Sequence, residues 1–168
     1  MSLQELVDRS EITELVSRLG VWLDEKCFDE ARSILTEDAT AKTPGGSVAG
    51  VDQVAEQARR NHAVPTQHVI TNVLIDLDGD RATVGANLIA TFVHGPDPSG
   101  PLFQRGEGYT FEAVRTADGW RLSRVESRPI WTIGSRAEAS TSQAFGTTGS
   151  AGETDGREAA EPGGKAPV

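Results

Sequence analysis

Apolar residues recur with helical spacing near the start of the chain. The run follows Ser2-Leu3-Gln4-Glu5, which has the spacing of a capping box at the start of a helix. Its apolar members lie three or four positions apart, as on one face of an amphipathic helix: Ile12, Leu15, Val16, Leu19, Trp22 and Leu23. Two shorter helices are expected after it, one that begins at Asp29 and includes Leu35, and one from Val51 that ends before Pro65.

From Thr66 the period of the apolar positions changes to two, which predicts strands. Four strands are expected, at residues 67–76, 81–94, 102–116 and 120–133. Asp-Gly pairs predict tight hairpins within the first and the last pair of strands. Helices followed by an antiparallel meander indicate an α+β fold. A curved sheet over a helical layer would leave a cavity suited to a small ligand.

The distribution of apolar residues divides the chain of 168 residues into two parts. Residues 1–136 carry enough of them for one domain with a real core. From Ala137 onward the chain has no Leu, Ile, Met, Trp or Tyr, and it is rich in Gly, Ala, Ser, Thr and Glu. Such a segment cannot bury enough apolar surface to offset the entropy of ordering it. We therefore expect one domain at 1–136 and a disordered tail at 137–168.

The net charge of −9 argues against nucleic acids and anionic membrane surfaces as partners. The N-terminus lacks the basic and apolar regions of a signal peptide, and no apolar run is long enough to span a membrane. The single cysteine, Cys27, excludes an internal disulfide and suits a reducing compartment. These features predict a cytoplasmic protein.

Asp24 and His68 are the residues best suited to chemistry. Asp24 lies at the end of the first predicted helix, where the helix dipole disfavours negative charge, so its carboxylate needs a partner or solvent. His68 lies in the first predicted strand. A carboxylate that contacts an imidazole fixes its tautomer and raises its basicity, so the pair can take or give a proton near neutral pH. The alternative is a structural histidine that is bonded to a local carbonyl.

Five further side chains are candidates for the wall of a substrate cavity. Strict alternation places Asn72 on the same strand face as the histidine. On the later strands, Tyr109 could donate a hydrogen bond to a carbonyl oxygen, and Arg128 could neutralise an enolate or a carboxylate. Trp131 could reach the same cavity, as could Trp22 from the first helix. A surface ion pair is the alternative for Arg128, and core packing is the alternative for Trp131.

The sequence predicts no metal or nucleotide cofactor. The three histidines, His62, His68 and His94, have no metal-ligand spacing, and there is no cysteine pair. The chain also contains no glycine-rich phosphate loop and no Gly-x-Ser-x-Gly nucleophile turn. His62 lies at the end of the third predicted helix, where a histidine commonly contacts free carbonyls, and His94 is expected to be exposed.

The order of these segments resembles the SnoaL-like proteins of the NTF2-like superfamily. The resemblance covers about residues 5–133. It begins with the helix that ends at Leu23-Asp24 and continues through Phe28-Asp29-Glu30-Ala31. The run Gln67-His68-Val69-Ile70-Thr71-Asn72 resembles the first long strand, and Asp118-Gly119-Trp120 resembles the turn of the last hairpin. No single motif is specific, but the series is typical of the fold.

The resemblance implies an α+β cone, in which N-terminal helices pack on a strongly curved, mainly antiparallel sheet that encloses an apolar pocket, often in a homodimer. Relatives include scytalone dehydratase, hexachlorocyclohexane dehydrochlorinase, polyketide cyclases and ketosteroid isomerase. Several eliminating members use an Asp–His dyad whose positions match Asp24 and His68. The tyrosine that dehydratases often carry one turn before the aspartate is replaced here by Leu19.

The sequence and the resemblance together predict a cofactor-independent lyase, isomerase or cyclase. It would act on a small, largely apolar biosynthetic intermediate, polyketide- or steroid-like, with His68 as general base and Asp24 as its orienting partner. One alternative is a non-catalytic module of the same fold that binds a small ligand or another molecule. Another is a cyclase that folds its substrate and tolerates the loss of His68.

Overall fold

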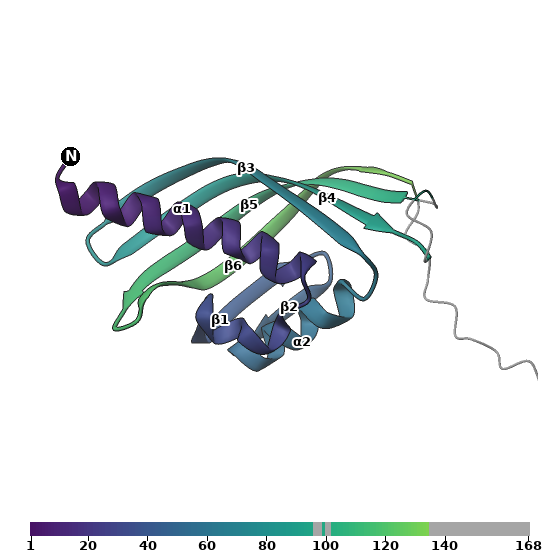
Figure 1. Ribbon diagram of the computed structural model, residues 1–168, viewed down its shortest axis with the longest axis horizontal. Coiled ribbons are helices and arrows are strands. Elements are labelled where there is room, and N and C mark those ends of the chain that lie inside the picture. The colour runs from purple at the N-terminus through teal and green to yellow at the C-terminus, as the bar shows by residue number, and fades with distance from the viewer. Residues whose placement is uncertain (96–98, 100–101, 135–168) are drawn as a thin grey trace, which may run out of the picture. The chain divides into compact units, whose positions relative to one another are not determined.

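Six strands form one curved sheet in the order β2-β1-β6-β5-β4-β3 (Figure 1). The strands are β1 (Leu35–Thr43), β2 (Gly46–Ala49), β3 (Thr66–Asp78), β4 (Arg81–Val93), β5 (Leu102–Thr116) and β6 (Gly119–Ile133). All neighbouring strands are antiparallel except β1 and β6, which run parallel. This computed structural model describes residues 1–95, 99 and 102–134, so the tail expected at 137–168 lies outside the described residues.

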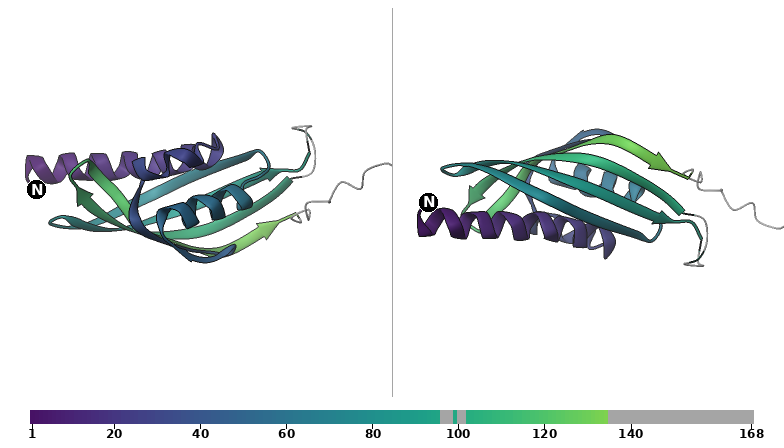
Figure 2. Two further views of the ribbon diagram at one scale, coloured as in Figure 1. Left: turned by 90° about the horizontal axis from the view of Figure 1, so that it is seen from below. Right: turned by 90° about the horizontal axis from the view of Figure 1, so that it is seen from above.

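The helices cover one face of the sheet, which curves around them (Figure 2). They are α1 (Leu3–Asp24), the short 3-10 helix η1 (Phe28–Ser33) and α2 (Val51–Asn61). The predicted capping box starts α1: the Ser2 hydroxyl accepts from the backbone N–H of Glu5 at 3.1 Å, and the Glu5 carboxylate accepts from that of Ser2 at 2.8 Å. The α+β class and the curved, mainly antiparallel sheet are confirmed.

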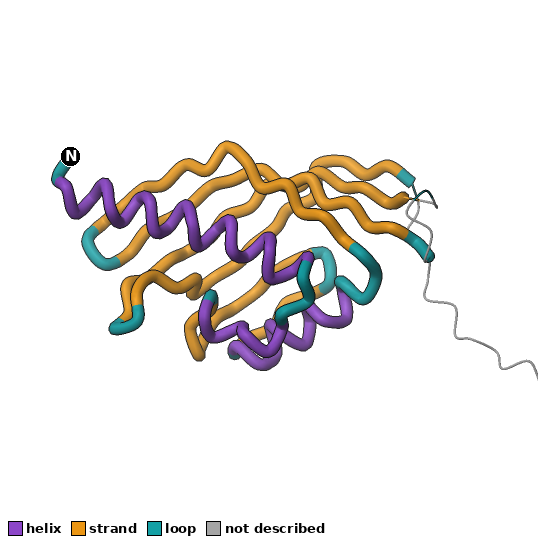
Figure 3. The backbone as a smooth tube through the Cα atoms, in the orientation of Figure 1, coloured by secondary structure: helices purple, strands orange, loops and turns teal. Residues whose placement is uncertain are grey.

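The second predicted helix is wrong beyond Ser33. Residues Leu35–Thr43 form β1 instead, and a turn leads from it into β2, so the sheet has two strands that the sequence did not predict (Figure 3). β1 is held by parallel pairing with β6, and its small residues Ala39 and Ala41 are buried in the core. The local sequence does not reveal this pairing, because a short segment with acidic residues forms a strand here only by pairing with β6, which is distant in the sequence.

The four predicted strands are present, with ends that differ by no more than two residues from the expected ones. Both Asp-Gly hairpins are also confirmed. Gly79 and Gly119 occupy the two turns with φ of 59° and 96°, a conformation that glycine adopts at little cost.

A bulge interrupts β3 at Asn72. This residue has a φ of 55°, and the pairing of β3 with β4 shifts register between Thr71 and Leu74. One extra residue reverses the alternation of every side chain beyond it. Before the bulge, even-numbered residues such as His68 are therefore more buried than odd-numbered ones. After the bulge, the odd-numbered residues are the more buried ones. Asn72 itself is exposed, so its expected place beside His68 is corrected.

Helix α1 approaches β3 closely at Gly20. A Cβ atom at this position would lie 3.7 Å from the carbonyl oxygen of His68 and 3.8 Å from the Cβ of His68, which is ordinary van der Waals contact. Asp24 lies one helical turn further along α1. The close packing therefore brings the end of α1 against the start of β3, where His68 lies.

Candidate active site

Asp24 and His68 form a hydrogen-bonded pair where α1 meets β3. The Nδ1–H of His68 donates to Oδ1 of Asp24 at 2.6 Å, and the backbone N–H of His68 donates to Oδ2 at 2.9 Å. A carboxylate only accepts hydrogen bonds, so this contact keeps the ring proton on Nδ1 and leaves Nε2 as an acceptor. The imidazole thus has the tautomer that a general base requires.

Thr66 and Lys26 extend the hydrogen-bond network of the Asp24 carboxylate. The Thr66 hydroxyl donates to Oδ1 of Asp24 at 3.0 Å and accepts from Nζ of Lys26 at 2.8 Å. Lys26 also donates to the carbonyl oxygen of Leu23, in the last turn of α1, at 3.2 Å. These contacts supply the compensation that a carboxylate needs at the C-terminal end of a helix.

The His68 side chain is only 1% exposed. This burial lowers its pKa below the ordinary value of 6.5, against the opposing effects of the hydrogen bond and the charge of Asp24. The positive charges of Arg105 and Lys26 lower the pKa further. The imidazole is therefore neutral, and able to accept a proton, at pH 7.

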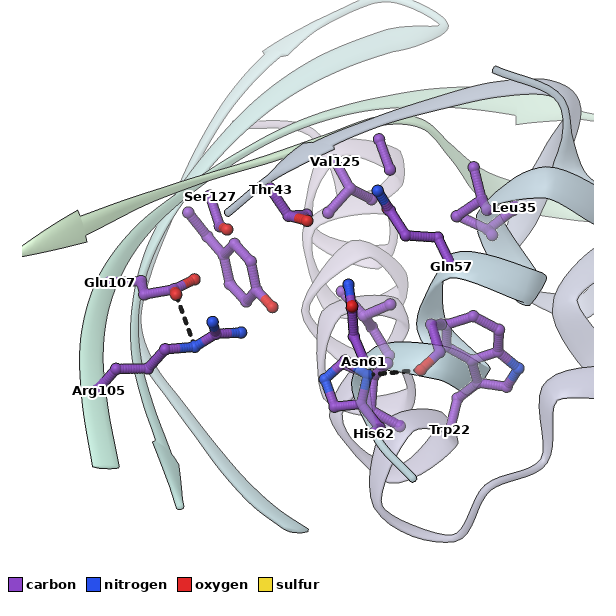
Figure 4. A pocket seen from close by; sticks show the side chains of 16 residues that line it. Trp22, Leu35, Thr43, Gln57, Asn61, His62, Arg105, Glu107, Val125 and Ser127 are labelled. Carbon is purple, nitrogen blue, oxygen red and sulfur yellow. Dashed lines mark hydrogen bonds and ion pairs between the residues drawn. The ribbon is translucent and has the colours of Figure 1, made fainter. Parts of the chain in front are cut away.

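A cavity lies between α1, α2 and the inner face of the sheet (Figure 4). Its volume is about 50 Å³, which is room for a few water molecules. A ring-sized ligand therefore has to displace side chains of the wall. Apolar side chains from several elements form one part of this wall: Leu19, Trp22, Leu23, Leu35, Val54 and Val125. Polar side chains form the rest, among them Gln57, Asn61, His62, Arg105, Glu107 and Ser127.

His62 is the histidine on the cavity wall. Its ring centroid lies 5.0 Å from that of His68, which does not itself line the cavity. As the sequence predicts, His62 contacts a carbonyl of the helix end: its Nδ1–H donates to the oxygen of Ala58 at 2.8 Å. That oxygen is not free, because it also accepts from the backbone N–H of His62 at 3.0 Å. The position of His62 in the site was missed, because the end of a helix does not indicate what the ring will face.

Arg105 and Glu107 add a buried ion pair to the wall, and the sequence analysis missed both. They lie two positions apart on β5 and so point to the same face. Nε of Arg105 is 2.8 Å from Oε1 of Glu107, and their side chains are 11% and 1% exposed. One signal could have found them. They occupy odd-numbered positions of the strand, as do the buried Phe103 and Tyr109, so all four side chains point to the same face.

A known family matches most of the described domain. Residues 4–126 match the model of the SnoaL-like domain. The chain belongs to the SnoaL-like family. The resemblance to SnoaL-like proteins of the NTF2-like superfamily is thereby confirmed.

Relatives of this SnoaL-like chain include one protein and two solved structures. The uncharacterized protein Rv2910c of Mycobacterium tuberculosis (strain ATCC 25618 / H37Rv) is 31% identical over 134 residues, which cover 76% of this chain and 90% of that protein. A putative scytalone dehydratase from Novosphingobium aromaticivorans DSM 12444 has a TM-score of 0.72 and 20% identity over 86% of this chain and 99% of that one. Hexachlorocyclohexane dehydrochlorinase LinA-type3 from Novosphingobium barchaimii LL02 has a TM-score of 0.69 and 18% identity over 79% of this chain and 92% of that one. The two structures share the fold.

Two of the predicted binding residues of this SnoaL-like domain, Trp22 and Tyr109, do line the cavity. Trp22 is buried and packs edge-on against Phe28, with ring centroids 5.3 Å apart. Burial, with the nearby charge of Glu107, raises the pKa of Tyr109 above its ordinary value of 10.0. Tyr109 therefore keeps its proton near neutral pH and can act as a hydrogen-bond donor.

Three other predicted binding residues lie away from the cavity, on the outer face of the sheet. Arg128 is exposed and extends over Gly108, where a Cβ would be 3.6 Å from its Nη2. The indole of Trp131, 40% exposed, occupies the space beside Gly106 that a Cβ would need. Asn72 joins Arg128 in an open groove of this face. The bulge in β3 turns Asn72 outward, and a register shift between β5 and β6 moves the end of β6.

Among residues 1–95, 99 and 102–134, no three His, Cys, Asp or Glu side chains gather as a metal site would require. In the same part of the chain, none of the helices combines the length and the apolar character needed to cross a membrane.

Replacing His62 by glutamine is expected to make the domain less sensitive to acid. Burial lowers the pKa of His62 to about 3, so below pH 6.5 the unfolded chain binds a proton that the folded domain does not. Stability is therefore lost as the pH falls from 6.5 toward 3, by up to about 1.4 kcal/mol per pH unit. Urea unfolding measures the free energy of unfolding at pH 7 and at pH 4.5. The decrease between these two pH values should be about 2 kcal/mol smaller in His62→Gln than in the wild type. An equal decrease in both proteins would contradict the lowered pKa of His62.

Proposed function

We propose that this SnoaL-like protein is a cofactor-independent lyase or isomerase that moves a proton on a small, largely apolar molecule. The observation that carries the proposal is the hydrogen bond from Nδ1 of His68 to Asp24, which leaves Nε2 as a neutral base. The His68 ring lies 5.0 Å, centroid to centroid, from that of His62 on the cavity wall. The names of two structures with the same fold, a putative scytalone dehydratase and a dehydrochlorinase, support this reaction class.

In the proposed reaction, His68 acts as general base. Its Nε2 takes a proton from a substrate carbon next to an activating group, and the electron pair of the broken C–H bond moves into the substrate. Asp24 stabilises the imidazolium that forms through the 2.6 Å hydrogen bond. Return of the proton to another carbon gives an isomer, and loss of a leaving group from the neighbouring carbon gives an elimination.

The resemblance to the family suggests a finer form of the proposal. In it, the substrate is a polyketide- or steroid-like biosynthetic intermediate, and the protein is a cytoplasmic homodimer. Cyclisation of such an intermediate is the third reaction that the same base could serve. Tyr109 and Trp22 would then bind the substrate, since both line the cavity.

A ligand-binding module of the same fold is the second candidate. One observation favours it: the His68 side chain is only 1% exposed and does not line the cavity. A module of this kind would bind a small ligand without using the base.

Deuterium exchange from solvent tests the proposal without knowledge of the natural substrate. Small cyclic ketones and β-hydroxyketones would be incubated with the protein in D₂O, and deuterium uptake next to the carbonyl would be followed by NMR. We expect the wild type and His94→Gln, a histidine control outside the site, to accelerate exchange or elimination, and His68→Gln to lose this acceleration. Equal rates in wild type and His68→Gln would overturn the proposal, and binding without any exchange would favour the ligand-binding module.

A further inference from the structure

We propose that Arg105 and Glu107 form a subsite that selects an uncharged carbonyl oxygen of the ligand over a carboxylate. This inference rests on the proposed function for the proton-transfer step, but ligand binding alone can test it. It names the substrate class as neutral ketones or aldehydes with a hydrogen on the adjacent carbon.

The position of the pair suits a role in ligand recognition. Both side chains come from the inner face of β5 and line the cavity, and the guanidinium of Arg105 points away from the strand into the space in front of the sheet (Figure 4). Glu107 lies beside it, with Nε of Arg105 2.8 Å from Oε1. The side chains are 11% and 1% exposed, so a ligand in the cavity would meet these charges with little water between them.

The two contacting atoms leave hydrogen-bonding capacity unused. Nε of Arg105 and Oε1 of Glu107 are in ion-pair contact, but neither completes an aligned hydrogen bond within the described part of the chain. Buried polar groups of this kind are costly unless a partner satisfies them. A guanidinium has five N–H donors, so it can donate to a ligand oxygen while it keeps its contact with the carboxylate.

The charge of the pair decides which oxygen fits. Arg105 and Glu107 together are neutral, so a carbonyl oxygen gains a donor without adding charge to the site. A ligand carboxylate would instead place a second negative charge next to the buried Glu107. Like charges that share a buried site repel each other strongly. The subsite therefore favours the uncharged oxygen.

The same arginine is coupled to the proposed base through one aromatic ring. The Arg105 guanidinium lies over Phe92, 5.1 Å from its centroid, and Phe92 contacts the rings of His62 and His68 at 5.8 Å and 6.2 Å. When His68 takes the proton from the adjacent carbon, the C–H electron pair becomes the double bond of an enolate, and negative charge moves to the oxygen. Arg105 would stabilise that charge where it develops.

Matched six-membered rings test the inference in the full-length protein. Cyclohexanone, methylenecyclohexane and cyclohexanecarboxylate differ only in the group offered to the subsite, and their dissociation constants can be compared by ligand-observed NMR. The ¹³C shift of the cyclohexanone carbonyl reports its hydrogen bond directly. The proteins are the wild type, Glu107→Gln, the charge-free double variant Arg105→Met/Glu107→Gln, and His68→Gln. Circular dichroism confirms that each variant is folded.

We expect the wild type to bind cyclohexanone about tenfold or more tightly than either of the other rings, as a hydrogen bond to a charged group would provide. The double variant should lose the preference for cyclohexanone over methylenecyclohexane and the change in the carbonyl ¹³C shift, while the cost of burying a carboxylate remains. Glu107→Gln leaves Arg105 uncompensated, so it should bind the carboxylate at least tenfold more tightly than the wild type does. Preferential binding of the carboxylate by the wild type would overturn the inference. So would an unchanged preference for cyclohexanone over methylenecyclohexane in the folded double variant.

His68→Gln separates the two proposals. If it keeps the preference for cyclohexanone while the wild type shows no proton exchange, the subsite stands and the proposed reaction fails. If the wild type catalyses exchange that depends on His68 but shows no preference for the carbonyl, the reaction stands and the subsite fails.

Discussion

Replacing His68 by glutamine is expected to lower kcat by about 10²- to 10⁴-fold, which is the usual contribution of a general base. Glutamine keeps a side chain of similar reach in this buried position but cannot take a proton from carbon at neutral pH. Because His68 is proposed to act in the chemical step and is 1% exposed, the loss should appear in kcat more than in KM. Steady-state kinetics on any substrate found by deuterium exchange measures both constants.

Asp24→Asn should cause a loss of similar size by a different route. An amide can still contact Nδ1–H of His68, but it carries no charge to stabilise the imidazolium. The pH profile distinguishes the two variants. In the wild type the base is neutral above its lowered pKa, so kcat/KM should fall only below about pH 6.5. Asp24 opposes this lowering, so Asp24→Asn should move the acidic limb to still lower pH.

Two results would contradict this view of the dyad. One is near-normal turnover in both variants. The other is a loss of activity that is matched by a loss of folded protein, which circular dichroism and urea unfolding would detect. His94→Gln serves as the control for a histidine substitution, since His94 lies in neither the dyad nor the cavity wall.

Phe92→Ala is expected to lower the free energy of unfolding by about 3–5 kcal/mol, the usual cost of truncating a buried phenylalanine. Phe92 is only 2% exposed, and its ring packs on His62, on Phe103 at 5.7 Å and under the guanidinium of Arg105. Its removal opens a cavity and also removes the surface that supports three polar side chains of the site. Urea unfolding at pH 7 measures the loss.

Phe111→Ala is the matched control for this prediction. Phe111 is fully buried on the next strand, so its truncation should cost a similar free energy. It contacts Tyr109 rather than the histidines, at 4.8 Å between centroids. NMR titration of the imidazoles should therefore change in Phe92→Ala and stay close to wild type in Phe111→Ala. A loss below about 1 kcal/mol in Phe92→Ala would mean that the site does not depend on this ring.

Much of the fold was predictable because its signals are local. The capping box, the helical stripe of α1 and the two Asp-Gly turns each specify an element from neighbouring residues. The first part of β1 carries no such signal, and only its pairing with β6 makes it a strand. The bulge in β3 did leave a trace: unbroken alternation from His68 would have turned Asp76 and Asp78 toward the core, and a carboxylate is rarely buried there without a partner.

The site was predictable only in part, for a related reason. Asp24 and His68 are suited to each other by chemistry and by their places at the ends of predicted elements, and the structure brings them within 2.6 Å. The cavity wall depends instead on which way single side chains point. Arg105 and Glu107 look like surface residues by type, and Arg128 looks like a ligand-binding residue. Alternation along the strands instead buries Arg105 and Glu107 and leaves Arg128 exposed. Residue type is a weak guide where one step along a strand changes the face.

The contact between Oδ2 of Asp24 and the backbone N–H of His68 has a consequence for solubility. β3 is the last strand of the sheet, and His68 is paired with β4 on one side only. Open edges with unpaired amides are where sheets of separate molecules join and aggregate. The carboxylate occupies one of those amides at 2.9 Å, so the residue proposed to serve catalysis also blocks a position at which a second chain could add a strand.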